Sequence, residues 1–464
     1  MKKTYTMDMT EGPILKKMLV FSLPLMLSSM LQLMFNAADI MVVGKFSGDA
    51  SLAGVGSCGP LIGLITNLFI GFSVGANVAV ARYYGSGERE ECNRAVHTAM
   101  LISFIGGLVL TVVGFFGAET FLILMKSPEN VLPLSALYMR IYFLGMPVMM
   151  LYNFGSAILR AVGDTKRPLY YLFAAGIVNV ILNLIFVIGF QMDVAGVALA
   201  TIVSQAMSAV LVMIALSKEE EAIRLSLRNL RINRRHFLEM LRIGLPAGLQ
   251  GTLFSLSNVV IQSGINRFGD LMVSASSAAG NLEGFIYQGM NAFYQSTVSF
   301  CSQNIGARKT ERILPIIKCG IACVVVTGIV MSAVILIFSQ QLLSLYSDTQ
   351  EVIDAAKIRL IIVCVPYFIL GMMDVMVGAL RGIGYSVAPM VISLCGVCGV
   401  RLSWMYFVFL IPSLTKIEMI FYSYPISWFI TFITQIICFS ILWKRKRRQL
   451  EYDPTESTKA HAKV

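Results

Sequence analysis

Twelve long apolar stretches follow one another along this chain of 464 residues. A helix needs about 20 apolar residues to cross the hydrocarbon core of a bilayer. The stretches cover approximately residues 14–43, 53–81, 95–118, 135–159, 169–190, 195–217, 237–265, 273–302, 314–338, 358–380, 386–411 and 419–443. Backbone groups in lipid must bond within their own element, and the alternation typical of a β-barrel is absent. We therefore predict an all-α integral membrane protein with twelve transmembrane helices.

The composition and the placement of charge agree with a multi-pass membrane protein. Hydrophobic residues make up 56% of the chain and charged residues 14%, against about 25% charged residues in soluble domains. The net charge of +11 could indicate a nucleic acid partner. Lysine and arginine, however, gather at both termini and in alternate loops, as they do in cytoplasmic segments. Arg160 and Arg381 belong to these cytoplasmic loops, whereas Arg359 is one of the few that remain for an outer loop or outer helix end. We predict a cell (inner) membrane protein with both termini in the cytoplasm and no nucleic acid partner.

The two halves of the chain repeat each other. Leu159-Arg160 recurs as Leu380-Arg381, Gly163 as Gly384, Pro168 as Pro389 and Gly85 as Gly306, each pair 221 residues apart. Six helices per half give both halves the same orientation, and repeated halves are typical of transporters that work by alternating access. We predict an N-lobe over residues 1–217, a cytoplasmic linker over 218–236, a C-lobe over 237–443 and a basic cytoplasmic tail over 444–464.

The first half carries one carboxylate inside a predicted span, Asp39. Ionisable groups at membrane depth are costly and usually mark an ion or substrate pathway. Asn179 and Asn183 are four residues apart and therefore share a helix face, and Thr201 lies on the next span. These oxygens could surround Na⁺ together with Asp39, or Asp39 could take up a proton; a hydrogen-bonded packing cluster is the alternative. Pro24 should bend the same helix as Asp39, because it removes a backbone hydrogen bond.

The second half carries two carboxylates that lie clearly inside predicted spans, away from the span ends, Glu283 and Asp374. They could form a second cation site or neutralise a cationic substrate. The polar and aromatic residues on the same span as Glu283 include Tyr287, Gln288 and Asn291, followed by Tyr294 and Gln295. Aromatic faces attract organic cations, so we treat the two carboxylates and the first three of these residues as a candidate substrate-binding or second acidic site. Packing against lipid or other helices is the alternative for the aromatic residues.

Two patterns resemble enzyme motifs but fit helix packing better. Residues 71–75 match the GxSxG nucleophile pattern, which needs a strand-to-helix turn and a nearby histidine. Here the pattern lies within a span, and His97, His236 and His461 fall at or beyond the predicted cytoplasmic face. Gly71 and Gly75 instead suit close helix contact. We predict that the protein is not an enzyme, has no cofactor, and binds no metal other than Na⁺ at Asp39.

Several of these segments, taken together, resemble the multidrug and toxic compound extrusion (MATE) family over nearly the whole chain. The segments are Leu23-Pro24, Asn36-Ala37-Ala38-Asp39, Asn179 to Asn183, Gly196 to Thr201, and Arg160 to Pro168 with its repeat Arg381 to Pro389. The resemblance implies two six-helix lobes in a V and export driven by entry of Na⁺ or H⁺. It also implies that Asp39 is the coupling carboxylate, supported by Asn179, Asn183 and Thr201. Several prokaryotic relatives carry Asp where this chain has Asn183, which cannot hold a proton.

The expected activity is therefore secondary active export of small, cationic, amphipathic compounds by a monomer, with the energy taken from an ion gradient. A flippase for lipid-linked sugars or a metabolite exporter of the same fold is the alternative. A flippase predicts a cavity rich in arginine and lysine, which bind pyrophosphate well. The spans carry few such residues apart from Arg140 and Arg401.

Overall fold

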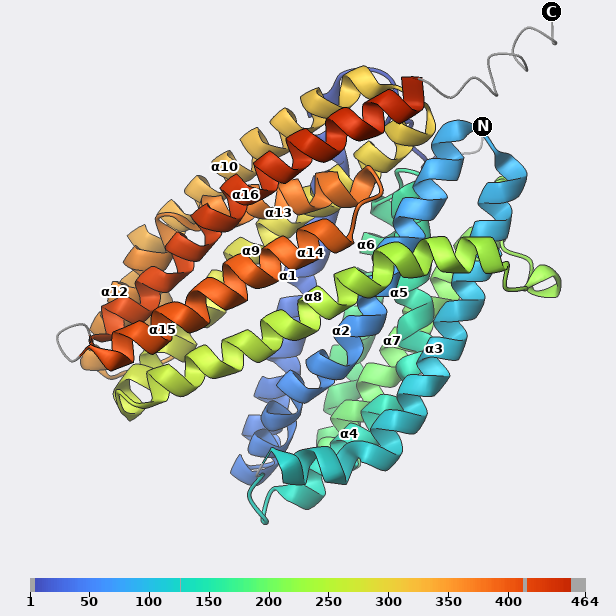
Figure 1. The fold of residues 1–464 in the computed structure, drawn as a ribbon. Coiled ribbons are helices and arrows are strands. Elements are labelled where there is room, and N and C mark those ends of the chain that lie inside the picture. The colour runs from blue at the N-terminus through green and yellow to red at the C-terminus, as the bar shows by residue number, and fades with distance from the viewer. Residues whose placement is uncertain (1–4, 126, 412–414, 452–464) are drawn as a thin grey trace, which may run out of the picture.

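The computed structural model describes residues 5–125, 127–411 and 415–451, and all regular elements in these ranges are helices. The residues beyond 451, with most of the predicted basic tail and His461, lie outside the described residues, as do Lys2 and Lys3. The helices form two lobes that lie against each other (Figure 1). The predicted fold class, an all-α membrane protein with two six-helix lobes, is confirmed.

The first lobe contains the helices before the linker. They are α1 (Ile14–Phe46), α2 (Asp49–Ser86), α3 (Arg89–Leu124), α4 (Leu132–Leu144), α5 (Met146–Ala161), α6 (Lys166–Asn183), the π-helix η1 (Leu184–Gly189) and α7 (Asp193–Ser217). The helix α1 continues through Pro24 without interruption. The pair α4 and α5 is bent by 50°, and Pro147 in the first turn of α5 lacks the N–H that would continue α4.

The second lobe follows the short 3-10 helix η2 (Leu227–Asn229). Its helices are α8 (Arg234–Asn266), α9 (Asp270–Gly306), η3 (Thr310–Arg312), α10 (Ile313–Ile337), α11 (Ser339–Leu343), α12 (Gln350–Cys364), α13 (Tyr367–Gly382), α14 (Val387–Ser393), the π-helix η4 (Leu394–Gly399), α15 (Val400–Leu410) and α16 (Ile417–Glu451). The pair α12 and α13 is bent by 44° next to Pro366. The last helix is longer than the predicted span 419–443.

Ten segments of the described chain are long and apolar enough to cross a membrane, when each bent pair is counted as one span. The two remaining long helices are α8 and α9, which are more polar. Both pack along α2 of the other lobe. Because these two helices face protein and cavities on that side, they need fewer apolar residues than helices surrounded by lipid.

The two lobes contact each other at the end of the molecule where both termini lie, which we call the termini end. From there the helices of the two lobes diverge toward the opposite end, the open end (Figure 1). The interlobe contact runs along α2 and α8. The Nδ2 of Asn67 donates to Ser255 Oγ at 3.3 Å, and Ser299 Oγ of α9 donates to Asn77 Oδ1 at 3.1 Å. The molecule therefore has the shape of a V.

Glycines allow the α2 and α8 backbones to touch. A Cβ added to Gly71 would lie 2.2 Å from the backbone nitrogen of Gly248, and one added to Gly75 would lie 2.3 Å from the backbone oxygen of Met240. The repeat-related Gly85 and Gly306 allow the same close contact between α2 and α9. A Cβ added to Gly85 would lie 2.2 Å from the backbone oxygen of Gln303, and one added to Gly306 would lie 2.0 Å from the backbone oxygen of Arg82. The prediction that Gly71 and Gly75 serve close helix contact is confirmed.

The residues before α1 bridge the two lobes. The Met7 amide donates to the carbonyl of Val162 in the first lobe at 3.1 Å. The Met9 amide donates to Gln303 Oε1 of the second lobe at 3.2 Å, while Asn304 Nδ2 donates back to the Met9 carbonyl at 3.0 Å. The Met9 side chain is fully buried. This segment therefore closes the termini end together with the α2–α8 contact.

Substitution of Gly71 by alanine should destabilise the protein, because the new methyl group would overlap the α8 backbone. We expect a loss of about 1–3 kcal/mol, measured as a lower melting temperature of purified protein in detergent. The matched control is Gly63→Ala on the same helix, where an added Cβ meets nothing within 4 Å. Equal melting temperatures for the two variants would show that the close contact does not stabilise the fold.

Candidate functional site

The predicted N-lobe residues form one cluster. Asp39 of α1 accepts a hydrogen bond from Asn183 Nδ2 of α6, and the same nitrogen approaches Asn179 Oδ1 at 3.3 Å. The Thr201 hydroxyl on α7 also interacts with the Asp39 carboxylate. Asn179 and Asn183 are buried, as expected from their shared helix face. Three helices thus bring a carboxylate, two amides and a hydroxyl together within the membrane.

Two features in and directly after α6 position the residues of this cluster. The first is Gly176, where an added Cβ would lie 1.8 Å from the Phe35 ring of α1, so that α1 and α6 approach closely one turn before Asn179. The second is the π-helix η1, which starts directly after Asn183; such insertions occur often at functional sites. The Oδ1 of Asn183 is buried and accepts no hydrogen bond from the described residues. An oxygen in this state can coordinate a cation or a water molecule.

Two tyrosines that the sequence interpretation missed lie near this cluster. Tyr138 and Tyr142 of α4 stack on each other at 5.9 Å between ring centroids, and both are close enough to Asp39 to interact electrostatically with it. Their spacing of four residues on a predicted span was the available signal, because it places both rings on one helix face. They supply an aromatic wall beside the carboxylate.

The C-lobe holds a cavity of about 620 Å³, and Glu283 lines it. Glu283 accepts two hydrogen bonds from Arg359 of α12, at 2.8 Å from Nε and 2.9 Å from Nη2. Both side chains are buried. The sequence interpretation had assigned Arg359 to an outer loop or outer helix end, whereas it lies inside the lobe because Glu283 neutralises it there. The charge of Glu283 is therefore already balanced by the protein.

Arg401 lies in the same cavity without a carboxylate partner among the described residues. Its Nε donates to Ser427 Oγ at 2.9 Å, and its guanidinium lies 4.3 Å from the ring centroid of Tyr424 and 5.7 Å from that of Trp428. Aromatic faces stabilise a cation that has lost water. The other arginine noted in the sequence, Arg140, pairs with Glu119 at 2.9 Å on the surface.

Asp374 lies on α13 and also lines the C-lobe cavity, together with Tyr287. Unlike Glu283, it forms no hydrogen bond or ion pair with the part of the chain that the structure describes. Asn291 lines a different cavity, between the lobes. Gln288 is half-buried and lies on the wall of neither cavity. The predicted second site is thus divided: three of its residues share a cavity and two do not.

The cavity between the lobes measures about 250 Å³ and contains Arg160 of α5. Its repeat-related residue, Arg381, is buried and donates to the Tyr294 hydroxyl and, at 2.9 Å, to Gln250 Oε1. Arg160 interacts electrostatically with the same Tyr294. The sequence interpretation had counted both arginines with the cytoplasmic loops. They lie inside instead. Polar side chains of α2, α5 and α9 line the cavity with Arg160, and Tyr294 of α9 and Gln250 of α8 bind Arg381.

The profile of the MatE family matches residues 24–185 and again residues 246–407, which is one match for each lobe. The chain belongs to the MatE family. The double match follows the internal repeat, and the expected transporter class is confirmed at the level of the family. This membership agrees with membrane-spanning helices and with cavities inside and between the lobes.

Individual relatives of this MatE chain differ in their described substrates. It is 28% identical to a probable multidrug resistance protein, YoeA, of Bacillus subtilis, over 95% of this chain and 97% of that protein. It is 26% identical to a protein of Shewanella oneidensis described as an FAD transporter, over 83% and 86%. The fold matches that of a multidrug resistance MATE family transporter in an outward-facing conformation with a TM-score of 0.89 at 20% identity, over 97% of this chain and all of that one.

Removal of either partner of the Glu283–Arg359 pair should destabilise the protein strongly, because the remaining charge would be buried and unpaired. We expect about 3–5 kcal/mol for Glu283→Gln or Arg359→Met, measured by thermal unfolding in detergent. The double variant should lose much less than the sum of the two single losses. Additive losses would contradict the pairing and would mean that the charge of Glu283 is not balanced by Arg359.

Proposed function

We propose that this protein is a secondary active exporter that couples outward movement of small organic molecules to entry of Na⁺ or H⁺. Both termini would lie in the cytoplasm of a cell (inner) membrane protein, so that the open end of the V faces outward. The clustering of basic residues at the termini end supports this orientation. The likeness to a transporter solved in an outward-facing conformation supports it as well.

The observation that carries the coupling proposal is the cluster around Asp39. A carboxylate at membrane depth faces Asn183 and Thr201 from two other helices, and Asn183 keeps one buried oxygen without a partner among the described residues. Carboxylate, amide and hydroxyl oxygens suit a hard cation. In proton coupling, Asp39 itself would take up the proton, since Asn183 has no acidic group.

Small, cationic, amphipathic substrates fit the C-lobe cavity. Asp374 offers it a carboxylate that forms no ion pair with a described side chain, although Arg381 attracts it electrostatically, and Tyr287 offers an aromatic face. A cation with an apolar ring system could use both groups at once. Asp374 is therefore the residue that we assign to substrate charge, with Glu283 assigned to the stability of the lobe. The multidrug resistance relatives support this substrate class.

A second candidate function is export of an anionic metabolite, or flipping of lipid-linked sugars. Arg160 and Arg381 approach Tyr294 from the two lobes, and Arg160 lines the interlobe cavity without a carboxylate beside it among the described residues. A phosphate group would be a favourable partner for arginines in this place. The relative described as an FAD transporter supports this candidate.

The remaining assignments are part of the same proposal. The transporter would act as a monomer, without a cofactor and without a nucleic acid partner. The domain limits stay as predicted, with lobes over residues 1–217 and 237–443. Pro24, which lies in α1 between the interlobe contact and Asp39, would allow α1 to bend when the ion binds.

Asp39→Asn should abolish gradient-driven efflux of a cationic dye from proteoliposomes, because the neutral amide cannot exchange a charge. We expect a fall of at least tenfold in the initial rate, with wild type driven by either an imposed Na⁺ or an imposed H⁺ gradient. The matched control is Asp348→Asn in an exposed loop. Full gradient-driven efflux in Asp39→Asn would refute the coupling role of Asp39.

Arg160→Gln should separate the two candidate substrates. If the exported compounds are cations, removal of this positive charge leaves dye efflux unchanged or faster. If the substrate is an anionic metabolite, the variant loses FAD efflux by roughly tenfold, since a charge-assisted hydrogen bond is lost. The measurement compares initial rates for a cationic dye and for FAD in the same proteoliposomes. Asp374→Asn serves as the opposite variant and should slow only the dye.

A further inference from the structure

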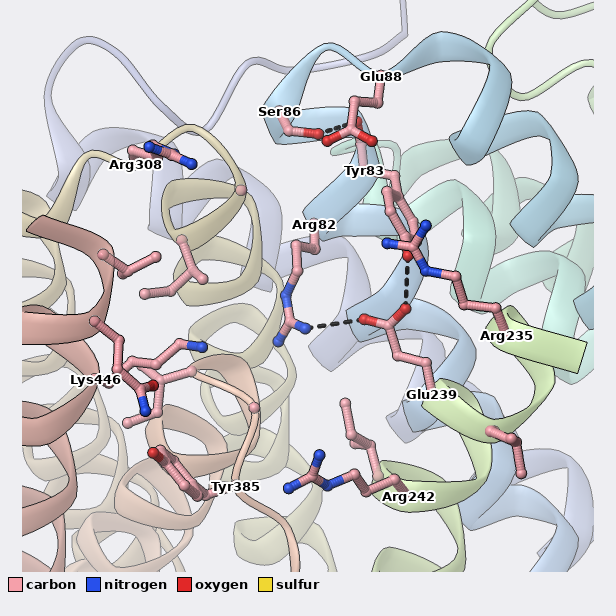
Figure 2. A pocket seen from close by; sticks show the side chains of 18 of the residues that line it. Arg82, Tyr83, Ser86, Glu88, Arg235, Glu239, Arg242, Arg308, Tyr385 and Lys446 are labelled. Atoms are coloured by element: carbon pink, nitrogen blue, oxygen red, sulfur yellow. Dashed lines mark hydrogen bonds and ion pairs between the residues drawn. The ribbon is translucent and has the colours of Figure 1, made fainter. Parts of the chain in front are cut away.

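A further cavity lies at the termini end, apart from the membrane-depth clusters described above. It measures about 990 Å³, which is within the range of small-molecule sites. Residues of α2, α8, the end of α9, the α13–α14 turn and α16 line it. Figure 2 shows Arg82 reaching into this space from α2, with Arg242 on the α8 side and Lys446 on the opposite wall.

The cavity has a strong excess of positive charge. Its cationic residues are Arg82, Arg235, Arg242, Arg308, Arg445 and Lys446, and its acidic residues are Glu88 and Glu239. Glu239 is occupied, since it accepts hydrogen bonds from Arg82 at 2.9 Å and from the Tyr83 hydroxyl at 2.8 Å (Figure 2). Glu88 is the one other acidic residue of the described lining that remains for cations such as Arg242, Arg445 and Lys446.

Several cationic groups lack partners within the described chain. The side chains of Arg242, Arg445 and Lys446 form no hydrogen bond or ion pair with other described residues. The Nε and Nη2 atoms of Arg82 are buried and also have no partner there. The charges of Arg82 and Arg242 act unfavourably on Lys446, and the charge of Glu239 offsets part of this repulsion. Such a concave cluster of like charges is stabilised when an anion enters it.

The walls of the cavity come from both lobes. Arg82 belongs to the first lobe, whereas Arg242 and Lys446 belong to the second. Gly384, which has a φ of +102°, leaves room for the Arg82 guanidinium, since an added Cβ would lie 2.9 Å from Nη2. An anion held by these groups would connect the two lobes across their closed end.

We propose that this cavity is a binding site for a phosphate-bearing anion, which binds between the lobes and stabilises the state with the termini end closed. Two sources share this chemistry. One is the head group of an anionic lipid, because basic pockets between transmembrane helices bind such head groups. The apolar residues Leu238, Ile243, Ile305, Ile383 and Leu450 on the same walls suit the attached glycerol and acyl chain. The other source is a soluble phosphate compound.

A solvated basic surface would differ from this site in one measurable way. On a solvated basic surface, anions are attracted by the net charge alone. Removing any two basic residues from such a surface should therefore weaken anion binding equally. A built site makes Arg242 and Lys446 different from basic residues elsewhere on the same end. Arg228 of the linker and Arg448 of α16 provide the comparison, since they lie outside the cavity lining.

The experiment compares wild type, Arg242→Gln with Lys446→Gln, and Arg228→Gln with Arg448→Gln. The two double variants have the same net charge and alter exposed or half-buried side chains. Native mass spectrometry of the purified full chain measures retained phosphatidylglycerol, and thermal unfolding in phosphatidylcholine nanodiscs measures protection by added inorganic phosphate. We expect the cavity variant to lose affinity by roughly tenfold and the comparison variant to match wild type.

Each outcome bears on the proposal. Loss of phosphatidylglycerol in the cavity variant alone supports the site with a lipid source. Loss of phosphate protection in that variant alone supports it with a soluble source. Lys446→Arg should retain binding, because it keeps the positive charge. Equal losses in both double variants, or no loss in either, would overturn the proposal and leave a solvated basic surface.

Discussion

The contact between the backbones of α2 and α8 is the constraint on which the rest of this structure depends. Helices without large side chains between them can touch through backbone atoms, and Gly71, Gly75 and Gly248 allow this between α2 and α8. The contact joins the lobes along one end and leaves them free to diverge at the other. The interlobe cavity with Arg160 lies beside this contact, and the basic cavity with Arg82 lies beyond it.

Some charged side chains inside the molecule are paired with other residues of the chain, and others are not. Glu283 and Arg359 neutralise each other within the C-lobe, and Arg401 lies against aromatic rings. Asp39 and Asp374 form no ion pair with the described residues, although Arg381 is close enough to Asp374 to attract it electrostatically. A buried charge that the protein itself neutralises contributes to the fold, whereas an un-neutralised one costs stability and must have another use. This distinction separates the carboxylates that we assign to transport from the one that we assign to stability.

The sequence predicted the fold well because the length of each hydrophobic stretch and the internal repeat can both be recognised directly along the chain. It also predicted which residues gather around Asp39, since Asn179 and Asn183 share a helix face. Glu283 and Arg359 are 76 residues apart, and no pattern in the sequence connects them. Arg160 and Arg381 were placed with the loops because a basic residue at a helix end looks the same whether it faces solvent or a cavity. Tyr138 and Tyr142 were missed because an aromatic residue in a span is usually apolar packing.

Alternating access, in which one repeated half moves against the other, requires the lobes to separate at the α2 contact during each transport cycle. Asn77 of α2 and Ser299 of α9 touch across the lobes, with 3.1 Å between Oδ1 and Oγ. Replacing both by cysteine, in a chain whose nine native cysteines are replaced by serine or alanine, allows a reversible disulfide across the contact. Dye efflux from proteoliposomes should stop when this pair is oxidised and return after reduction. Full efflux by completely cross-linked protein would contradict the account.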